Sequence, residues 1–210
     1  MTHFSGQNLT CIRSERLVFE GLDFTLETGD ALVLAGPNGA GKSSLLRLMT
    51  GLLPPAGGTI FWDDQPIEED REAHHQRLHY VSHLDSLKPV LSAVENLTFW
   101  SGLGGGPTDR ATVITALERF GIAHAADLPC RFLSAGQRRR VNLARLLARP
   151  APIWLLDEPT TALDSEAEVR LTSAVEEHRA SGGLVVAATH SDLKLRGAQT
   201  LALGEPQAVA

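Results

Sequence analysis

One octapeptide constrains this 210-residue chain more than any other feature. Residues 36–43, Gly-Pro-Asn-Gly-Ala-Gly-Lys-Ser, fit the pattern G-x-x-x-x-G-K-[ST]. An apolar run at residues 31–35 precedes it, and helical periodicity follows at residues 43–52. Glycines between a strand and a helix let backbone N–H groups curl around phosphate oxygens, and the helix N-terminus adds positive potential. The pattern therefore predicts a nucleotide-binding loop.

The polar side chains of this loop have predicted roles in binding ATP. Lys42 supplies a point charge for the β- and γ-phosphates, and Ser43 supplies a hydroxyl for Mg²⁺. The predicted nucleotide contacts of the loop are Gly36, Pro37, Asn38, Gly39, Ala40, Gly41, Lys42, Ser43 and Ser44.

A second apolar run, residues 153–156, ends in two carboxylates, Asp157 and Glu158. Successive strand residues point to opposite faces, so the two acids should face different ways. We predict that Asp157 holds Mg²⁺ and that Glu158 orients the attacking water. By themselves the acids could simply begin a loop, but behind a phosphate-binding loop the catalytic interpretation is favoured.

Strand-like and helix-like segments alternate along the chain. Residues 184–188 form another apolar run, and helical periodicity covers residues 135–148 and 166–179. This alternation predicts an α/β fold in which a mostly parallel sheet has helices on its faces. Residues 16–26 alternate apolar with polar side chains, which predicts antiparallel strands beside that sheet.

The middle of the chain is different. Helical patterns at residues 93–100 and 110–120 are separated by a glycine-rich segment, residues 102–107, which predicts a flexible joint with no side chains to pack. We interpret residues 84–133, approximately, as a helical subdomain within a single domain of residues 1–210.

A short motif, Leu133-Ser134-Ala135-Gly136-Gln137, precedes a basic helix. A serine hydroxyl and small residues at a helix N-terminus form a surface that suits phosphate, although a simple N-cap by Ser134 is the plainer interpretation. Taken with the phosphate loop and the two carboxylates, the sequence resembles an ABC ATPase nucleotide-binding domain. Its signature is LSGGQ, and Ala135 here replaces the first glycine.

The resemblance implies a P-loop NTPase fold with an antiparallel β subdomain and an inserted helical subdomain. It implies Mg²⁺-dependent ATP hydrolysis, with His190 reaching the γ-phosphate beside Lys42 and Glu158. It also implies an ATP-dependent, head-to-tail homodimer, with Asp164 at the dimer contact. The signature residues that would face the nucleotide of the other copy are Ser134, Gly136 and Gln137.

Two positions depart from the family pattern. His83 stands where the family has a glutamine that links Mg²⁺ to the helical subdomain; a neutral imidazole offers a lone pair, whereas a protonated one does not. The alternative is that His83 faces the subdomain joint and contacts nothing. Where the family stacks adenine on an aromatic ring, alignment gives Arg13, whose flat guanidinium can stack on a base. Arg16 and Phe19 are alternatives.

One branch of the family is the most similar: the ATP-binding subunit of the haem exporter used in cytochrome c biogenesis. The similarity lies in His83, in the segments at residues 87–97 and 133–141, and in the short sequence after His190. It implies integral membrane subunits as partners and a peripheral position on the cytoplasmic face of the bacterial inner membrane. It also implies that hydrolysis is coupled to release of a haem-loaded chaperone.

Other functions remain open within the family. One is the ATPase of another transporter, for lipids, drugs or nutrients. Another is a non-transport ABC protein, which a single phosphate loop and the absence of heptads disfavour. A third is a binding-only regulator, against which the intact Lys42, Asp157, Glu158 and His190 argue.

Composition excludes several other classes. The net charge of −6 argues against a nucleic-acid partner. Cys11 and Cys130 do not suggest a disulfide framework, and we see no signal peptide and no run of about 18 apolar residues that could span a bilayer. We expect His74, His75 and His79 to lie on a solvated surface rather than in a metal site. No CxxCH motif occurs, so we expect no direct haem binding.

Overall fold

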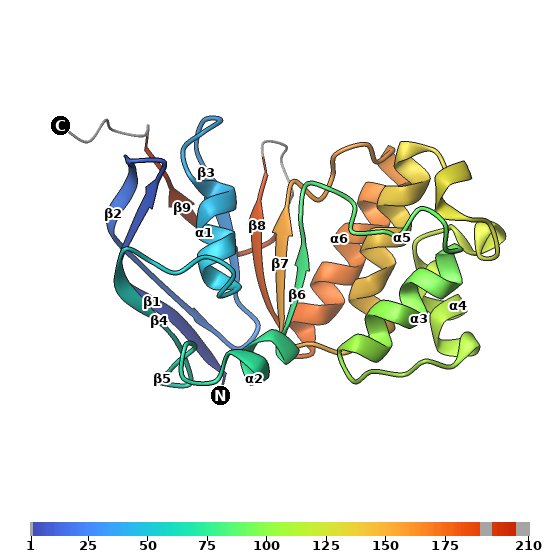
Figure 1. Ribbon diagram of the computed structural model, residues 1–210, viewed down its shortest axis with the longest axis horizontal. Coiled ribbons are helices and arrows are strands. Elements are labelled where there is room, and N and C mark those ends of the chain that lie inside the picture. The colour runs from blue at the N-terminus through green and yellow to red at the C-terminus, as the bar shows by residue number, and fades with distance from the viewer. Residues whose placement is uncertain (1, 190–194, 205–210) are drawn as a thin grey trace.

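The computed structural model describes residues 2–189 and 195–204, which form two sheets and a group of helices (Figure 1). The strands and helices in chain order are β1 (His3–Arg13), β2 (Arg16–Glu27), β3 (Ala31–Ala35), α1 (Lys42–Met49), β4 (Gly57–Trp62), β5 (Gln65–Pro66), α2 (Arg71–Gln76), β6 (Leu78–Val81), α3 (Ala93–Leu103), α4 (Arg110–Arg119), α5 (Ala135–Ala148), β7 (Ile153–Asp157), α6 (Ser165–Ala180), β8 (Leu184–Ala188) and β9 (Gln199–Ala202). Two short 3₁₀ turns lie at Ala123–Ala125 and Cys130–Phe132.

The larger sheet is parallel, with strand order β6-β7-β8-β3-β9. Its central strands β7 and β8 are buried at every residue, which explains their continuous apolar sequences. Alternate residues of β7 enter two different cores: Ile153 and Leu155 share a core with α1, whereas Trp154 and Leu156 share a core with α5 and α6. The three strands predicted for this sheet are confirmed.

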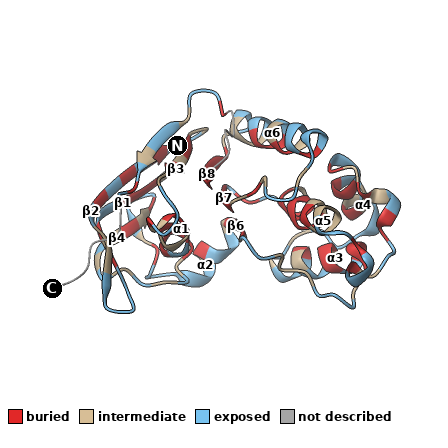
Figure 2. Ribbon diagram, turned by 90° about the horizontal axis from the view of Figure 1, so that it is seen from above, coloured by how far each residue is buried: buried red, intermediate tan, exposed pale blue. Residues whose placement is uncertain are grey.

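The smaller sheet is antiparallel, with strand order β2-β1-β4-β5. It packs on α1, because Phe4 and Leu26 share one core with Leu45 and Leu46 of that helix. Helix α1 therefore lies between the two sheets, as Figure 2 shows from above. The antiparallel strand expected at residues 16–26 is β2.

Helices α3, α4 and α5 pack together on the other side of the parallel sheet (Figure 1). Ser92 caps α3 in a capping box with Glu95, and the Asp109 carboxylate caps α4 by accepting from Thr112 N at 2.9 Å. Both helices agree with the periodicity in the sequence.

The glycine-rich segment between α3 and α4 has no side chains of its own to pack, but side chains of other residues lie against its backbone. A Cβ added at Gly106 would lie 2.6 Å from Cγ of Arg149 and 2.7 Å from Oγ of Ser101. The glycines allow this backbone to pass against the arginine side chain.

Candidate nucleotide site

The loop of residues 36–41 joins the end of β3 to the start of α1 and needs glycine at two positions in particular. Gly36 has φ 147°, and a Cβ there would lie 2.5 Å from the Leu203 carbonyl oxygen. Gly41 is the N-cap of α1 with φ 102°, in contact with Val18 and Phe19 of β2. A side chain at either position would collide with its neighbours and strain the backbone.

Two polar side chains at the start of α1 hold the loop together. Lys42 is 7% exposed, and its Nζ donates to the carbonyls of Gly36 at 2.7 Å and Pro37 at 3.1 Å. Ser43 Oγ donates to Asp157 Oδ1 at 2.9 Å. The structure therefore brings the phosphate loop and the acidic strand end, 114 residues apart in sequence, into direct contact.

Strand alternation does not govern the two acids, because β7 ends at Asp157 and both acids line the same cavity. Asp157 is the last residue of β7 and is 3% exposed. Glu158 lies beyond the strand in the left-handed region, with φ 47°, and its N–H donates to Ala188 O at 2.8 Å. The backbone therefore turns directly after Asp157.

Arg139 of α5 fixes this turn, which the sequence did not predict. Arg139 is 3% exposed, and its guanidinium donates to the carbonyls of Asp157 at 3.1 Å, Glu158 at 2.6 Å and Ser82 at 2.9 Å. Burial lowers its pKa, and the Asp85 carboxylate, 3.7 Å away, opposes that effect. The basic run after the signature therefore includes a buried structural arginine.

A cavity of about 450 Å³ lies beside the loop. It gathers the phosphate loop, His83, both acids and one residue that the sequence did not indicate, Thr161. Its lining residues are Asn38, Gly39, Gly41, Lys42, Ser43, Ser44, His83, Asp157, Glu158 and Thr161. Most of the predicted loop contacts, both acids and His83 thus share one cavity.

The signature residues are not part of that cavity. Ser134 caps α5 in a capping box: its Oγ accepts from Gln137 N at 3.2 Å, and the Gln137 side chain accepts from Ser134 N at 2.9 Å. A Cβ at Gly136 would lie 2.9 Å from the Ala162 carbonyl oxygen, so the first turn of α5 and the loop before α6 approach closely. Asp164 caps α6 and forms an ion pair with Arg140.

The three candidates for adenine stacking lie on the β1–β2 hairpin. Arg13 is exposed and lies opposite Arg16 in the backbone register at the end of the hairpin. Phe19 lies against Gly41 of the phosphate loop. Neither arginine lines the cavity. The stacking of adenine on Arg13 stays a prediction. The predicted γ-phosphate contact, His190, lies outside the described residues.

Two of the three clustered histidines are buried, so the expectation of a solvated surface was wrong for them. His74 is 1% exposed, with Nε2 2.8 Å from Met49 O, and His79 is 8% exposed, with Nε2 2.8 Å from Arg149 O. Burial lowers the pKa of His79 to about 3. His79 is buried because it lies on strand β6, where its ring contacts the backbone of Arg149. In the described ranges no group of three His, Cys, Asp or Glu side chains could hold a metal ion.

Comparisons with known proteins agree on one family. The sequence profile described as ABC transporter matches residues 19–161. The cytochrome c biogenesis ATP-binding export protein CcmA of Paramagnetospirillum magneticum is 55% identical over 204 residues, covering 96% of this chain and 94% of that protein. The protein of the same name from Rhodospirillum rubrum is 54% identical, covering 95% and 85%.

Solved structures have the same fold. A putative ABC transporter ATP-binding protein from Pyrococcus furiosus superposes with a TM-score of 0.84 at 24% identity, covering 96% of this chain and 97% of that one. A dimeric ATP-binding cassette in a post-hydrolysis state with ADP and Pi gives 0.86 at 23% identity, covering 99% of both chains. None of the helices that the structure describes combines the length and apolarity needed to cross a membrane.

Proposed function

This chain belongs to the ABC transporter family, among its cytochrome c biogenesis ATP-binding export proteins, and we propose that its hydrolysis of ATP drives haem export for cytochrome c assembly. The observation that carries the proposal is the 55% identity to such an export protein over 96% of the chain. The chain would work at the cytoplasmic face of the inner membrane of a bacterium, where hydrolysis releases a haem-loaded chaperone from the complex.

The proposed chemistry uses the residues that line the nucleotide cavity. Backbone N–H groups of the loop and the N-terminus of α1 would bind the phosphates, with the Lys42 ammonium beside them. Glu158 would orient the attacking water, and His190 would reach the γ-phosphate. The support is that Lys42, Asp157 and Glu158 line one cavity of about 450 Å³.

The residues at this cavity fit Mg²⁺. Ser43 Oγ and Asp157 Oδ1 lie 2.9 Å apart, and oxygen atoms are the ligands that Mg²⁺ prefers. We propose that Ser43 and Asp157 hold the ion and that His83, at the same cavity, contacts it directly or through water. When bound, Mg²⁺ would neutralise charge on the phosphates.

A complete catalytic site would need two copies of the chain. Ser134, Gly136 and Gln137 lie outside the cavity that the phosphate loop forms. We propose that a second copy, related head-to-tail, presents these residues to the nucleotide, with Asp164 near the contact. The signature begins α5, directly after the approximate helical subdomain at residues 84–133.

Transport would require integral membrane subunits, and an apolar groove offers a place for them. The groove lies between β6 and α3, beside Ser82, one residue before His83. Docking there would connect a membrane segment to the nucleotide cavity through residues 82 and 83.

Complementation tests the proposed function. A bacterial strain that lacks its own cytochrome c biogenesis ATP-binding export protein should regain covalently bound haem in c-type cytochromes when it expresses this chain. The Glu158→Gln variant, expressed at the same level, should not restore it. If the wild-type chain hydrolyses ATP and binds membranes of that strain yet restores no c-type cytochrome, the haem-export assignment is wrong.

A further inference from the structure

The guanidinium of Arg139 is enclosed by backbone carbonyl groups. Its Nε donates to Pro159 O at 3.3 Å, and its Nη1 donates to Ser82 O at 2.9 Å. Its Nη2 donates to the carbonyls of Asp157 at 3.1 Å and Glu158 at 2.6 Å. Each nitrogen of the planar group therefore donates to a carbonyl, in a direction that the geometry of the guanidinium fixes.

Arg139 holds the peptide groups on both sides of Glu158. The carbonyl of Asp157 belongs to the peptide group before Glu158, and the carbonyl of Glu158 belongs to the one after it. Glu158 has φ 47°, in the left-handed region that a residue with a Cβ adopts at a cost in free energy. Arg139 therefore stabilises the unfavourable backbone conformation in which Glu158 lines the nucleotide cavity.

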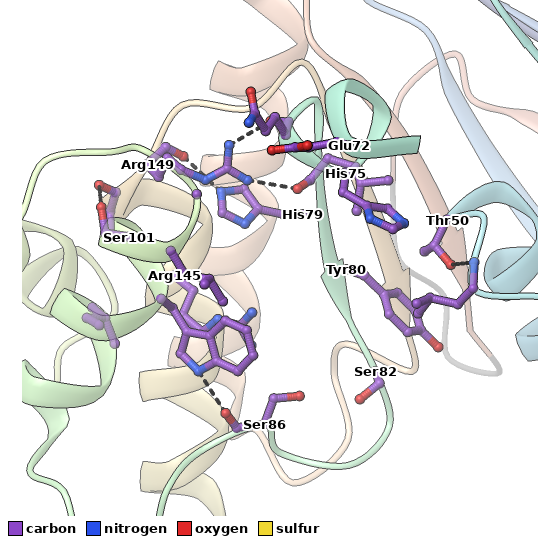
Figure 3. Close-up of a pocket in the computed structure, with 18 residues that line it drawn as sticks. Thr50, Glu72, His75, His79, Tyr80, Ser82, Ser86, Ser101, Arg145 and Arg149 are labelled. Carbon is purple, nitrogen blue, oxygen red and sulfur yellow. Dashed lines mark hydrogen bonds between the residues drawn. The ribbon is translucent and has the colours of Figure 1, made fainter. Parts of the chain in front are cut away.

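The same guanidinium holds the backbone next to His83. Ser82 directly follows β6 and lies beside the apolar groove in Figure 3, whereas His83 lines the nucleotide cavity. The Ser82 carbonyl that accepts from Nη1 of Arg139 belongs to the peptide group that joins Ser82 to His83. One rigid, planar group thus connects the backbone at Glu158 with the backbone at His83, although these residues are far apart in sequence.

Charge alone does not explain these contacts. Among the described residues, Asp85 is the carboxylate that forms an ion pair with Arg139, with its Oδ1 3.7 Å from Nη1. A lysine could keep that ion pair, but its ammonium is a single point charge, whereas a guanidinium presents its donors in a fixed fork. The arrangement around Arg139 therefore depends on the shape of the guanidinium as well as on its charge.

We propose that Arg139 is a positioning residue for ATP hydrolysis, which holds the carboxylate of Glu158 and the imidazole of His83 in one mutual geometry around the attacking water and Mg²⁺. Arg139 does not line the cavity, so it acts through these two residues. The inference rests on the roles proposed above for Glu158 and His83. A displacement of about 1 Å at a reacting group can lower a rate by about a hundredfold, so the loss of this support should appear in kcat.

Steady-state ATPase kinetics of the purified full chain separate positioning from nucleotide binding. Arg139→Lys keeps the charge but loses the fork of donors. We expect kcat to fall by about tenfold or more, and KM for ATP at saturating Mg²⁺ to stay within about threefold, because Lys42 and the phosphate loop are unchanged. The matched control is Arg179→Lys, because the guanidinium of Arg179 also donates to two carbonyls, those of Gly29 at 3.0 Å and Arg196 at 2.8 Å, but does not line the cavity. Its kcat should equal that of the wild type.

A double-mutant cycle shows whether Arg139 acts through Glu158. Once the carboxylate is gone, its correct placement matters less, so the two substitutions should not be additive. In single-turnover phosphate release, Arg139→Lys should slow the wild-type chain by about tenfold or more but slow the Glu158→Gln chain by less than about threefold. An equal loss in both backgrounds would overturn the inference, because Arg139 would then support hydrolysis without acting through Glu158.

A second variant, Arg139→Met, removes every donor, and the unfolding temperature of each variant shows whether it is folded. Either folded variant with the wild-type kcat would overturn the inference. Failure of both to fold would overturn it as well, because Arg139 would then be required by the fold as a whole. Wild-type kcat for Glu158→Gln would instead show that the role proposed for Glu158 is wrong. A slow Glu158→Gln together with a normal Arg139→Lys would exclude only the positioning role of Arg139.

Discussion

The ammonium group of Lys42 is the positive charge that the structure places in the nucleotide cavity, against the carbonyls of Gly36 and Pro37. Replacing it with Ala removes that charge from the phosphates that we propose it contacts. We predict that Lys42→Ala loses ATPase activity by about a hundredfold or more, measured as phosphate release by the purified chain. Lys88→Ala is the control, because Lys88 is exposed and lies over the ring of Phe99. Equal rates for both variants would exclude the proposed role of Lys42.

A second prediction concerns His83, which we propose contacts Mg²⁺ in place of the family glutamine. If its imidazole accepts a hydrogen bond from Mg²⁺-bound water or binds the ion, glutamine should replace it, because both side chains offer a lone pair. We predict that His83→Gln keeps ATPase activity within about threefold, whereas His83→Ala loses about tenfold or more. The comparison is made at saturating Mg²⁺. A fully active His83→Ala would mean that His83 contacts nothing essential.

At the scale of elements, the burial of His79 on strand β6 makes the free energy of unfolding depend on pH. The folded-state pKa of His79 is about 3, whereas an unfolded histidine has a pKa of about 6.5. Between these values the unfolded chain binds a proton that folded His79 does not. Its contribution to the free energy of unfolding is therefore complete above about pH 6.5 and falls by about 1.4 kcal/mol per pH unit below it.

Denaturant unfolding at pH 7, 6 and 5 measures this dependence. His79→Gln can still donate to Arg149 O but gains no proton, so its stability should fall less steeply than that of the wild type. His74 and His178, whose pKa values burial also lowers, contribute equally to both proteins. The exposed His75 supplies the control: His75→Gln should keep the wild-type slope. Identical slopes in all three proteins would show that His79 is not the buried neutral group.

Elements that are buried on both faces, or that begin at a clear cap, could be predicted from the sequence. Strands β7 and β8 are apolar throughout because helices cover both sides. Helix α5 begins where Ser134 and Gln137 form a capping box. Strands β6 and β9 escaped notice because they are short edge strands of the parallel sheet with polar residues, such as His79 and Gln199, in them.

Only part of the candidate site could be predicted from the sequence. The phosphate loop and the two acids follow from local motifs, whose chemistry requires fixed spacing. Arg139 and Thr161 carry no local signal, because their positions depend on tertiary contacts: Arg139 reaches the carbonyl of Ser82, 57 residues away. Likewise, nothing near Gly106 in sequence indicates that Arg149 packs against it.

At the scale of the whole molecule, one chain places the proposed nucleotide contacts and the signature residues on two separate surfaces. The cavity collects the phosphate loop and the acids, whereas Ser134, Gly136 and Gln137 lie elsewhere on the chain. Two copies would therefore close around ATP, and hydrolysis at Glu158 would let them separate. Glutamine at position 158 keeps the size of the side chain but cannot activate water as the carboxylate does, so it should trap the closed pair.

The most direct measurement is the molar mass of purified Glu158→Gln, determined by light scattering after size-exclusion chromatography with and without ATP and Mg²⁺. We expect a monomer without nucleotide and a dimer with ATP, whereas the wild-type chain, which hydrolyses its ATP, should remain mostly monomeric. A Glu158→Gln variant that stays monomeric at saturating ATP, or that is equally dimeric without nucleotide, would contradict the claim that two copies share the catalytic site.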